Sequence, residues 1–454
     1  MGIGCRTASA LVLGWLLAQG CSDAPPATDA FLSTKTPYAP RGDASSDERA
    51  PDGYRIVFTQ LLARHGSRAL TSDTDIAYVE QAIALADAAG SLTDLGRELP
   101  PQVASLRAAN EALGYGNLSG RGVEEHRDLA ARLLARLPDL FADAIASGRR
   151  IHVVTSGKDR AVDSAANFAD SLATHLPALA PSIEPAVDDQ RLLYFFKLDP
   201  DYQSWLANDR ELHAKLDAIF YAPGAHAAAR ALAERIFDAH FVDRLTAGSL
   251  PFTDPKTGKA VAVNEVDLAS SIYALYQVAP GLRDEGRWDF ARFVPREAAR
   301  WFAYVNDAYE FYQKGPSFAG ETITFEMARV LQDDFFRMAR AACDGDPFAL
   351  AADLRFAHAE TIMPLAALME LPSSDRQVPD AETFEYEQNP WRGAGVSPYA
   401  ANVQWDSYRN DAGDCLVRML YGERDTRFKS GCRSIEGRTF FYDLAELERC
   451  YGYP

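Results

Sequence analysis

The chain has 454 residues, a formal net charge of −18 at pH 7 and 47% hydrophobic residues. A protein this acidic is not a general nucleic-acid binder, and an anionic substrate would need a local basic pocket to offset the global field. The hydrophobic content is ample for a core, and the length suits one large domain with an inserted subdomain, or two domains.

The first residues resemble a targeting segment. Arg6 supplies a positive start, and the apolar run Ala8–Ala18 is too short to span a bilayer comfortably. The following LLAQGC, which ends at Cys21, resembles a bacterial lipoprotein cleavage box with Cys21 as the acylated residue. An ordinary secretory signal cleaved nearby is the alternative. We expect a signal peptide over 1–20 and export to the bacterial cell envelope, lipid-anchored through Cys21 or otherwise periplasmic or secreted.

The segment after Cys21 has no hydrophobic periodicity. Residues 22–52 are rich in Pro, Ala, Ser and Asp, a composition typical of linkers. We therefore expect a lipid-anchored flexible tether over 21–52, with the folded body beginning at Gly53. No later stretch is long and apolar enough to predict a transmembrane helix.

The folded body opens with a strand that ends in a basic cluster. The segment from Tyr54 is β-branched and aromatic, and it breaks into Arg64-His65-Gly66-Ser67-Arg68. A glycine directly after a strand lets the backbone turn sharply. An imidazole between two guanidiniums suits a phosphoryl group, whose oxygens match the planar fork of arginine. A basic surface turn is the alternative interpretation.

Two later strands end in the same way. Ile151–Ser156 reads as a buried strand followed by Gly-Lys158-Asp-Arg160, and the segment 352–357 is followed by His358-Ala-Glu360. Carboxyl ends of parallel strands share one edge of a sheet, where ligands bind. Taken alone, Arg160 would more often be a solvent residue at a helix start, and His-Ala-Glu a capping arrangement. Their shared position at strand ends favours one common site.

Helical patterns fill most of the remaining chain. Periodic apolar faces predict helices over 75–89, 118–137, 202–220, 225–245, 268–278, 296–313, 321–342 and 361–370. His126, among charged residues, is expected to be solvated. We expect an α/β core with a mixed or parallel sheet over 53–180 and 344–454. A mostly helical insertion over 181–343 covers it, from which Lys197 could reach into a pocket.

Cysteine usage fits export. The mature chain would keep Cys343, Cys415, Cys432 and Cys450, apart from the acylated residue. Four cysteines allow three pairings, and the sequence does not choose among them. We favour Cys432–Cys450, because it would fix the C-terminal tail. The spacings fit no zinc site.

The three junctions together supply the groups that phosphomonoester hydrolysis requires. His65 can attack phosphorus as a neutral imidazole, while Arg64, Arg68, Arg160 and His358 hold the phosphoryl oxygens. Glu360 can then protonate the departing alkoxide. Lys158 and Lys197 are candidates for further substrate contacts. This chemistry requires no metal, and we expect no metal or other cofactor.

These motifs resemble a known family. Arg64-His65-Gly66-Ser67-Arg68 is similar to the signature of the histidine phosphatases, in the branch that holds acid phosphatases and phytases. His358-Ala-Glu360 and the segment 156–164 resemble the multiple inositol polyphosphate phosphatases, although Asp159 stands where a histidine is common. The resemblance implies a phosphohistidine intermediate on His65.

The resemblance also implies an anionic small-molecule substrate, namely phytate and lower inositol phosphates. The same chemistry on a sugar phosphate or a bisphosphoglycerate is the nearest alternative. A phosphate-binding surface protein without catalysis is another, but it would need only the arginines and would leave His65, His358 and Glu360 unexplained. We expect no nucleic-acid partner, and contact with a membrane only through the anchor at Cys21.

Overall fold

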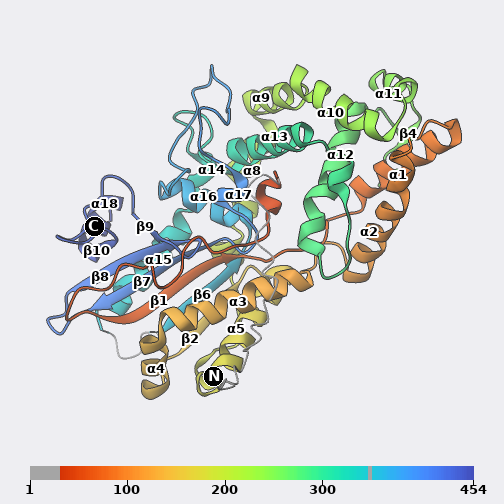
Figure 1. Ribbon diagram of the computed structural model, residues 1–454. Coiled ribbons are helices and arrows are strands. Elements are labelled where there is room, and N and C mark those ends of the chain that lie inside the picture. Colours follow the sequence, from red (N-terminus) through yellow and green to blue (C-terminus); the bar gives the residue numbers. More distant parts are fainter. Residues whose placement is uncertain (1–30, 346–349, 454) are drawn as a thin grey trace, which may run out of the picture. The chain divides into compact units, whose positions relative to one another are not determined.

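A mixed β-sheet forms the core of the α/β part of the protein, at the lower left of Figure 1. The computed structural model describes residues 31–345 and 350–453. Within them, eight strands form one sheet in the order β10-β8-β7-β1-β6-β2-β3, with β9 paired to β8. The strands are β1 (Arg55–Arg64), β2 (Ile151–Thr155), β3 (Val187–Asp188), β6 (Ala352–Ala357), β7 (Asn402–Arg409), β8 (Cys415–Tyr421), β9 (Asp425–Thr426) and β10 (Phe441–Asp443). Neighbours among β1, β6, β2 and β3 run parallel, and the other pairs are antiparallel.

Both faces of the sheet are covered by helices, as buried parallel strands require. Successive residues of a strand point to opposite faces. Leu61 therefore packs with α3 (Gly120–Arg136), α4 (Pro138–Ser147) and α5 (Asp159–His175). Leu62 packs on the opposite face with α15 (Arg329–Cys343), α16 (Ala359–Leu368) and α18 (Leu444–Tyr451). The predicted α/β fold with a flanked mixed sheet is confirmed.

A separate helical cluster adjoins the core. Its members are α1 (Thr74–Ala89), α2 (Leu99–Leu113), α10 (Pro223–Ile236), α11 (Ala239–Thr246), α12 (Glu265–Val278) and the first half of α13 (Arg296–Lys314). The packing crosses the predicted boundaries, 53–180 and 344–454 for the core against 181–343, at two places. The apolar faces of α1 and α2 pack on the inserted helices, whereas α15, from within the predicted insertion, packs on the sheet.

Several predicted helices are shorter than expected. The predicted helix 202–220 is divided into α8 (Pro200–Asn208) and α9 (Arg210–Phe220), because the Asp209 side chain accepts from the Leu212 amide and caps a new helix. Asp238 does the same between α10 and α11. The insertion also contains a hairpin, β4 (Phe252–Thr253) with β5 (Ala260–Val261). The remaining helices are α6 (Gln190–Leu193), α7 (Phe195–Leu198), α14 (Ile323–Glu326) and α17 (Gly393–Val396).

The predicted tether is wrong for residues 31–52, which are part of the folded body. Leu32, Ser33 and Thr34 are buried, and the Tyr399 amide donates to the Thr36 carbonyl at 2.9 Å. The segment orders because residues distant in sequence satisfy its backbone groups. The predicted signal peptide over 1–20, Cys21 and the rest of the tether lie outside the described residues.

The protein has two disulfides in the described residues, one between α15 and β8 and one within the C-terminal tail. Cys432 pairs with Cys450, as predicted, and Cys343 pairs with Cys415. Such bonds are typical of proteins that mature in an oxidising compartment outside the cytoplasm. In the described part of the chain, no helix is both long enough and apolar enough to cross a membrane.

Candidate active site

Three strand ends converge at one edge of the sheet, as the sequence predicts. β1, β6 and β2 are adjacent and parallel, and their registers bring their last residues level. His65 directly follows β1 and His358 directly follows β6, and the centroids of their rings are 5.5 Å apart. Ser156 follows β2 and places its Oγ 2.8 Å from Nε2 of His358. The site is therefore built by the parallel half of the sheet.

His65 is placed as a neutral nucleophile. Its Nδ1 lies 2.9 Å from the Gly66 carbonyl oxygen, so Nδ1 carries the proton and donates, and Nε2 keeps its lone pair. Burial, and then the charges of Arg64, Arg160 and Arg68, lower the pKa of His65 well below its ordinary value. The ring is thus uncharged at neutral pH, which is the form that attacks phosphorus.

The turn that aims His65 depends on a close backbone approach. A Cβ atom on Gly66 would lie 2.5 Å from the carbonyl oxygen of Gly122, in the first turn of α3. A Cβ on Gly122 would meet the Ser67 carbonyl oxygen at 2.2 Å. Only glycine fits at both positions. Gly66 of the basic motif and Gly122 of α3 are therefore both needed for this close packing of the two backbones.

Each of the three predicted arginines has a hydrogen-bond donor without a partner. Among the described residues, the buried Nε of Arg64, Arg68 and Arg160 has no hydrogen-bond partner. Arg64 is fixed by donating from Nη1 to the carbonyls of Thr34 (2.6 Å) and Ser397 (2.5 Å). Burial lowers its pKa to about 10, which leaves it charged at neutral pH. Converging buried donors of this kind fit an oxyanion.

His358 differs from His65 because both of its ring nitrogens are engaged. Arginine can only donate, so the 3.2 Å contact with Arg160 Nη2 makes Nδ1 of His358 an acceptor. Nε2 then carries the proton and donates to Ser156. Burial, followed by the charge of Arg160, lowers the pKa of His358 to about 3. This ring orients Arg160 and has no free lone pair for attack.

Glu360, in the first turn of α16, faces a lysine from the helical part. Lys314 Nζ at the end of α13 lies 3.8 Å from Glu360 Oε1 and 2.7 Å from Glu310 Oε2. Burial by itself would raise the pKa of Glu360, but the charge of Lys314, with smaller contributions from the backbone amide of Glu360 and from Arg64, outweighs it and holds the pKa below its usual range. The carboxyl is therefore ionised in the unliganded protein.

The two predicted lysines are placed differently. Lys158 precedes α5, and its Nζ lies 4.9 Å from the centroid of the Tyr194 ring, which in turn lies 5.3 Å from the His358 ring. Lys158 is thus on the rim of the site. Lys197 on α7 is exposed.

Sequence reasoning missed three charged or aromatic neighbours of the site. Tyr399 places its ring 4.6 Å from the Arg64 guanidinium and 6.0 Å from the His65 ring. Lys314 ends a helix of the insertion, and Lys35 lies in the segment expected to be a tether. No motif or periodicity marks these residues, because only the tertiary fold brings them to the sheet edge.

The expectation for His126 is wrong. Its side chain is fully buried, and Nε2 donates to the Arg64 carbonyl oxygen at 3.1 Å. Burial lowers its pKa to about 3. A signal was present, because His126 lies three residues before Leu129 on the apolar face of the helix. This histidine supports the end of β1 and does not face the reaction.

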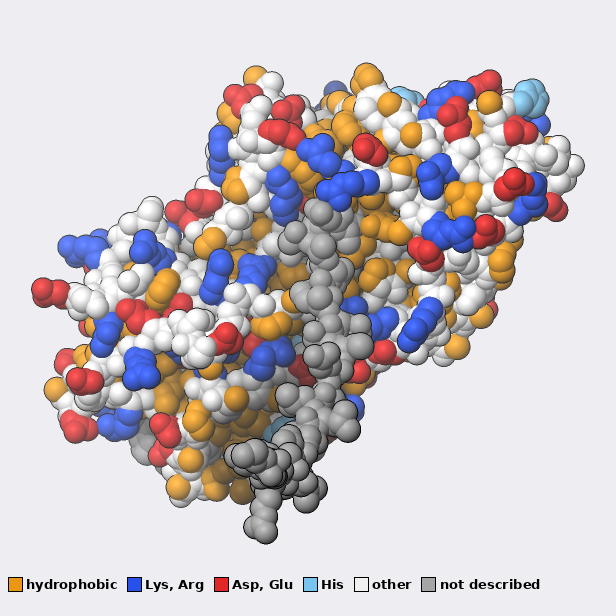
Figure 2. Space-filling view, in the orientation of Figure 1, with side chains coloured by type: hydrophobic (Ala, Val, Ile, Leu, Met, Phe, Trp, Pro, Cys, Tyr) orange, Lys and Arg blue, Asp and Glu red, His pale blue; other side chains and the backbone are white. Residues whose placement is uncertain are grey.

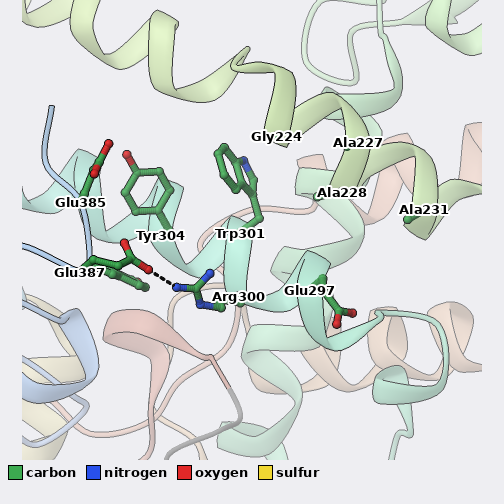
Figure 3. A pocket seen from close by; sticks show the side chains of 11 residues that line it. Gly224, Ala227, Ala228, Ala231, Glu297, Arg300, Trp301, Tyr304, Glu385 and Glu387 are labelled. Carbon is green, nitrogen blue, oxygen red and sulfur yellow. Dashed lines mark hydrogen bonds and ion pairs between the residues drawn. The ribbon is translucent and has the colours of Figure 1, made fainter.

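The helical part offers a pocket of different character (Figure 3). A cavity of about 550 Å³ lies between α10, α13 and the loop around residue 386, with Trp301 and Tyr304 on its wall. Its single arginine, Arg300, is paired with Glu387 at 2.6 Å. Without a free cation this pocket is unsuited to phosphate. Across the described ranges, no three His, Cys, Asp or Glu side chains are grouped to hold a metal ion.

The protein's acidity does not prevent a local basic site. On the face shown in Figure 2, lysines and arginines are interspersed with carboxylates. The net charge of −18 does not fix the local charge, because the fold brings three arginines together around His65.

Comparisons with known proteins agree with this geometry. The family model described as histidine phosphatase superfamily (branch 2) matches residues 55–217. The crystal structure of the Bifidobacterium longum multiple inositol polyphosphate phosphatase in complex with inositol hexasulfate is 30% identical. It has a TM-score of 0.87 and covers 93% of this chain and 97% of that one. The chain therefore belongs to branch 2 of the histidine phosphatase superfamily.

Within that superfamily, the similarity extends to animal proteins. The multiple inositol polyphosphate phosphatase 1 of Gallus gallus is 23% identical over 427 residues, which cover 90% of this chain and 86% of that protein. The phytase from D. castellii, 14% identical with a TM-score of 0.64, covers 93% of this chain and 84% of its own and shares the fold.

Proposed function

We propose that the protein hydrolyses phosphomonoesters of inositol polyphosphates through a phosphohistidine on His65. One observation carries the proposal: the three arginines whose charges act on His65 keep buried Nε donors without a partner, beside a neutral imidazole whose Nδ1, and not Nε2, carries the proton. Phosphate binding alone would need the arginines but not this tautomer. The geometry therefore supports covalent catalysis rather than simple capture of an anion.

In the proposed first step, the arginines hold the phosphoryl oxygens while His65 Nε2 attacks phosphorus. The N–P bond forms as the bond from phosphorus to the ester oxygen breaks, and Glu360 gives its proton to that oxygen. In the second step a water molecule attacks the phosphohistidine, Glu360 accepts a proton from it, and inorganic phosphate leaves. His358 keeps Arg160 in place through both steps.

Substrate binding lets Glu360 take up from solvent the proton that it lacks in the free protein. Lys314 keeps the carboxyl ionised, but a polyanionic substrate beside Glu360 opposes that effect and raises its pKa. The acid is then protonated in the complex that needs it.

The substrate class rests on the relatives and on local charge. The Bifidobacterium longum structure was determined with inositol hexasulfate, a sulfated inositol. In this chain Lys35, which has no ion-pair partner among the described residues, adds a basic group near Arg64 and Arg68 that a single phosphate would not require. Inositol polyphosphates match this charge.

The test is phosphate release from inositol hexakisphosphate by the purified protein. The wild-type protein should release phosphate, and His65→Ala should lose at least about 10³-fold of that activity while still binding the substrate. His240→Ala is the matched control, since it alters an exposed histidine on α11 of the helical part. A wild type that releases phosphate from glucose 6-phosphate or bisphosphoglycerate but not from inositol hexakisphosphate would contradict the substrate assignment.

We further propose that the protein is exported to the bacterial cell envelope and acylated at Cys21. The apolar run ending in LLAQGC supports this, and the two disulfides fit an oxidising compartment. Mass spectrometry of the mature N-terminus tests it. A diacyl mass on Cys21 is expected, and an unmodified N-terminus downstream of Cys21 would contradict the anchor.

A further inference from the structure

The segment 31–38, here called the N-terminal strap, is fixed on both sides of Lys35. On one side the Thr34 carbonyl accepts from Arg64 Nη1 at 2.6 Å, and the Ser33 hydroxyl donates to the buried carboxylate of Asp307. On the other side the Thr36 carbonyl accepts from the amide of Tyr399. These contacts join the strap to the sheet edge and to α13, so the backbone at Lys35 has a defined position beside the active site.

Lys35 has no ion-pair partner among the described residues, although four charged groups surround it. Arg68 and Arg64 repel its ammonium group, whereas Glu310 and Glu360 attract it. Both acids are already engaged by Lys314, at 2.7 Å and 3.8 Å. Burial and the two arginines lower the pKa of Lys35 well below its ordinary value. A half-buried cation in such surroundings is stabilised when an anion joins it.

The direction in which Lys35 acts follows from its neighbours. The arginines hold the phosphoryl group that His65 attacks, and Glu360 marks the side on which the leaving group departs. The residue before Lys35 contacts Arg64 at 2.6 Å, and Lys35 is within electrostatic range of both arginines and of Glu360 and Glu310, so it is close to the groups on both sides of the scissile bond. On an inositol polyphosphate, the leaving group carries the next phosphate in this region.

We propose that Lys35 binds a second phosphate, next to the one attacked by His65, and thereby selects polyphosphorylated substrates over monophosphates. This inference rests on the proposed function. The strap holds the lysine in place, so no loop has to close over the substrate. The N-terminal strap is thus a specificity element, and the carbonyl contact of Thr34 couples its position to that of Arg64.

The test compares two substrates in Lys35→Met, with Lys35→Arg as the conservative variant. For inositol hexakisphosphate, Lys35→Met should raise KM about 10-fold or more, as expected for loss of one charge-assisted hydrogen bond. For 4-nitrophenyl phosphate, which has no second phosphate, kcat/KM should change less than about 3-fold. Lys35→Arg should recover most of the affinity. Lys259→Met, at an exposed lysine of the β4–β5 hairpin, is the matched control and should change the kinetic constants for neither substrate.

The outcomes separate this inference from the proposed function. Equal losses on both substrates in Lys35→Met would place Lys35 at the scissile phosphate or in a purely structural role, and an unchanged KM for inositol hexakisphosphate would exclude the contact. Either result overturns the inference while wild-type activity leaves the proposed function standing. A wild type inactive on inositol hexakisphosphate would overturn both. Thermal unfolding of each variant identifies losses caused by misfolding.

Discussion

Replacing Lys314 with methionine should raise the pKa of Glu360 and move the pH profile of catalysis. Methionine keeps the length of the side chain and removes its charge. Lys314 is the principal group that lowers this pKa, and it lies 3.8 Å from the carboxylate. Without it, Glu360 keeps its proton to a higher pH, because burial and Glu310 both favour the neutral acid.

The size of the effect follows from the separation of the charges. Two unit charges at 3.8 Å interact by about 4 kcal/mol at an effective dielectric constant of about 20. The Glu360 side chain is 33% exposed, and Glu310 competes for the same ammonium group, so about 1–3 kcal/mol is a realistic share. At 1.36 kcal/mol per pKa unit, this corresponds to an increase of about 1–2 units.

The assay is the pH dependence of kcat, which reports the enzyme–substrate complex, on glycerol 2-phosphate, a monophosphate with a basic leaving group. An acid loses activity as pH rises above its pKa. The descending limb in Lys314→Met should therefore move upward by about 1–2 pH units. Glu310→Gln is the opposing variant, because it removes a negative charge and frees Lys314 to act on Glu360. Its limb should move downward.

Two results would refute the control of Glu360 by Lys314. An unchanged limb in Lys314→Met would mean that Lys314 does not control the acid. Shifts of Lys314→Met and Glu310→Gln in the same direction would mean that the change arises from the substrate or from altered folding, since the electrostatic account requires opposite signs.

Three further predictions concern the acid, a buried carboxyl and a disulfide. Glu360→Gln should slow hydrolysis of inositol hexakisphosphate by about 10²–10⁴-fold but that of 4-nitrophenyl phosphate far less, because a nitrophenolate leaves without a proton; equal slowing would remove Glu360 from the acid role. Burial raises the pKa of Asp307 to about 6 against 3.8 ordinarily, so the folded state binds the extra proton between these values. Urea titrations should then show the free energy of unfolding falling by about 2 kcal/mol from pH 4 to 7, and Asp307→Ala should lack this fall. Removing the Cys343–Cys415 disulfide, which spans 72 residues, should cost about 4 kcal/mol, about 1 kcal/mol more than removing the one that spans 18; the reverse order in chemical denaturation would contradict this.

The site could be predicted where a short stretch of sequence carries the signal. An apolar strand followed at once by ionisable residues occurs at His65, Arg160 and His358, and parallel pairing brings such ends together without any knowledge of the loops. The same logic fails for β7. Its Gln404 and Asp406 are fully buried because Gln404 and Arg418 donate to the Asp406 carboxylate. The alternation of polar and apolar residues in β7 would instead predict a strand with one face exposed to solvent.

The N-terminal strap could not be predicted, for a related reason. Its composition is that of a linker, and its order depends on partners far along the chain, such as Asp307 and Tyr399. Local propensity carries no record of such contacts. Lys35 and Lys314 are invisible in the sequence for this reason, although they set the charge around the predicted acid.

The central claim is that phosphate is transferred to His65, and trapping the intermediate tests it most directly. Wild-type protein mixed with excess inositol hexakisphosphate and quenched within milliseconds in alkaline denaturant, which preserves phosphohistidine, should yield a phosphorylated peptide when mapped by mass spectrometry. The account predicts the modification on Nε2 of His65, and none in His65→Ala. Phosphate mapped to His358, or a pre-steady-state burst of product with no phosphorylated histidine, would contradict it.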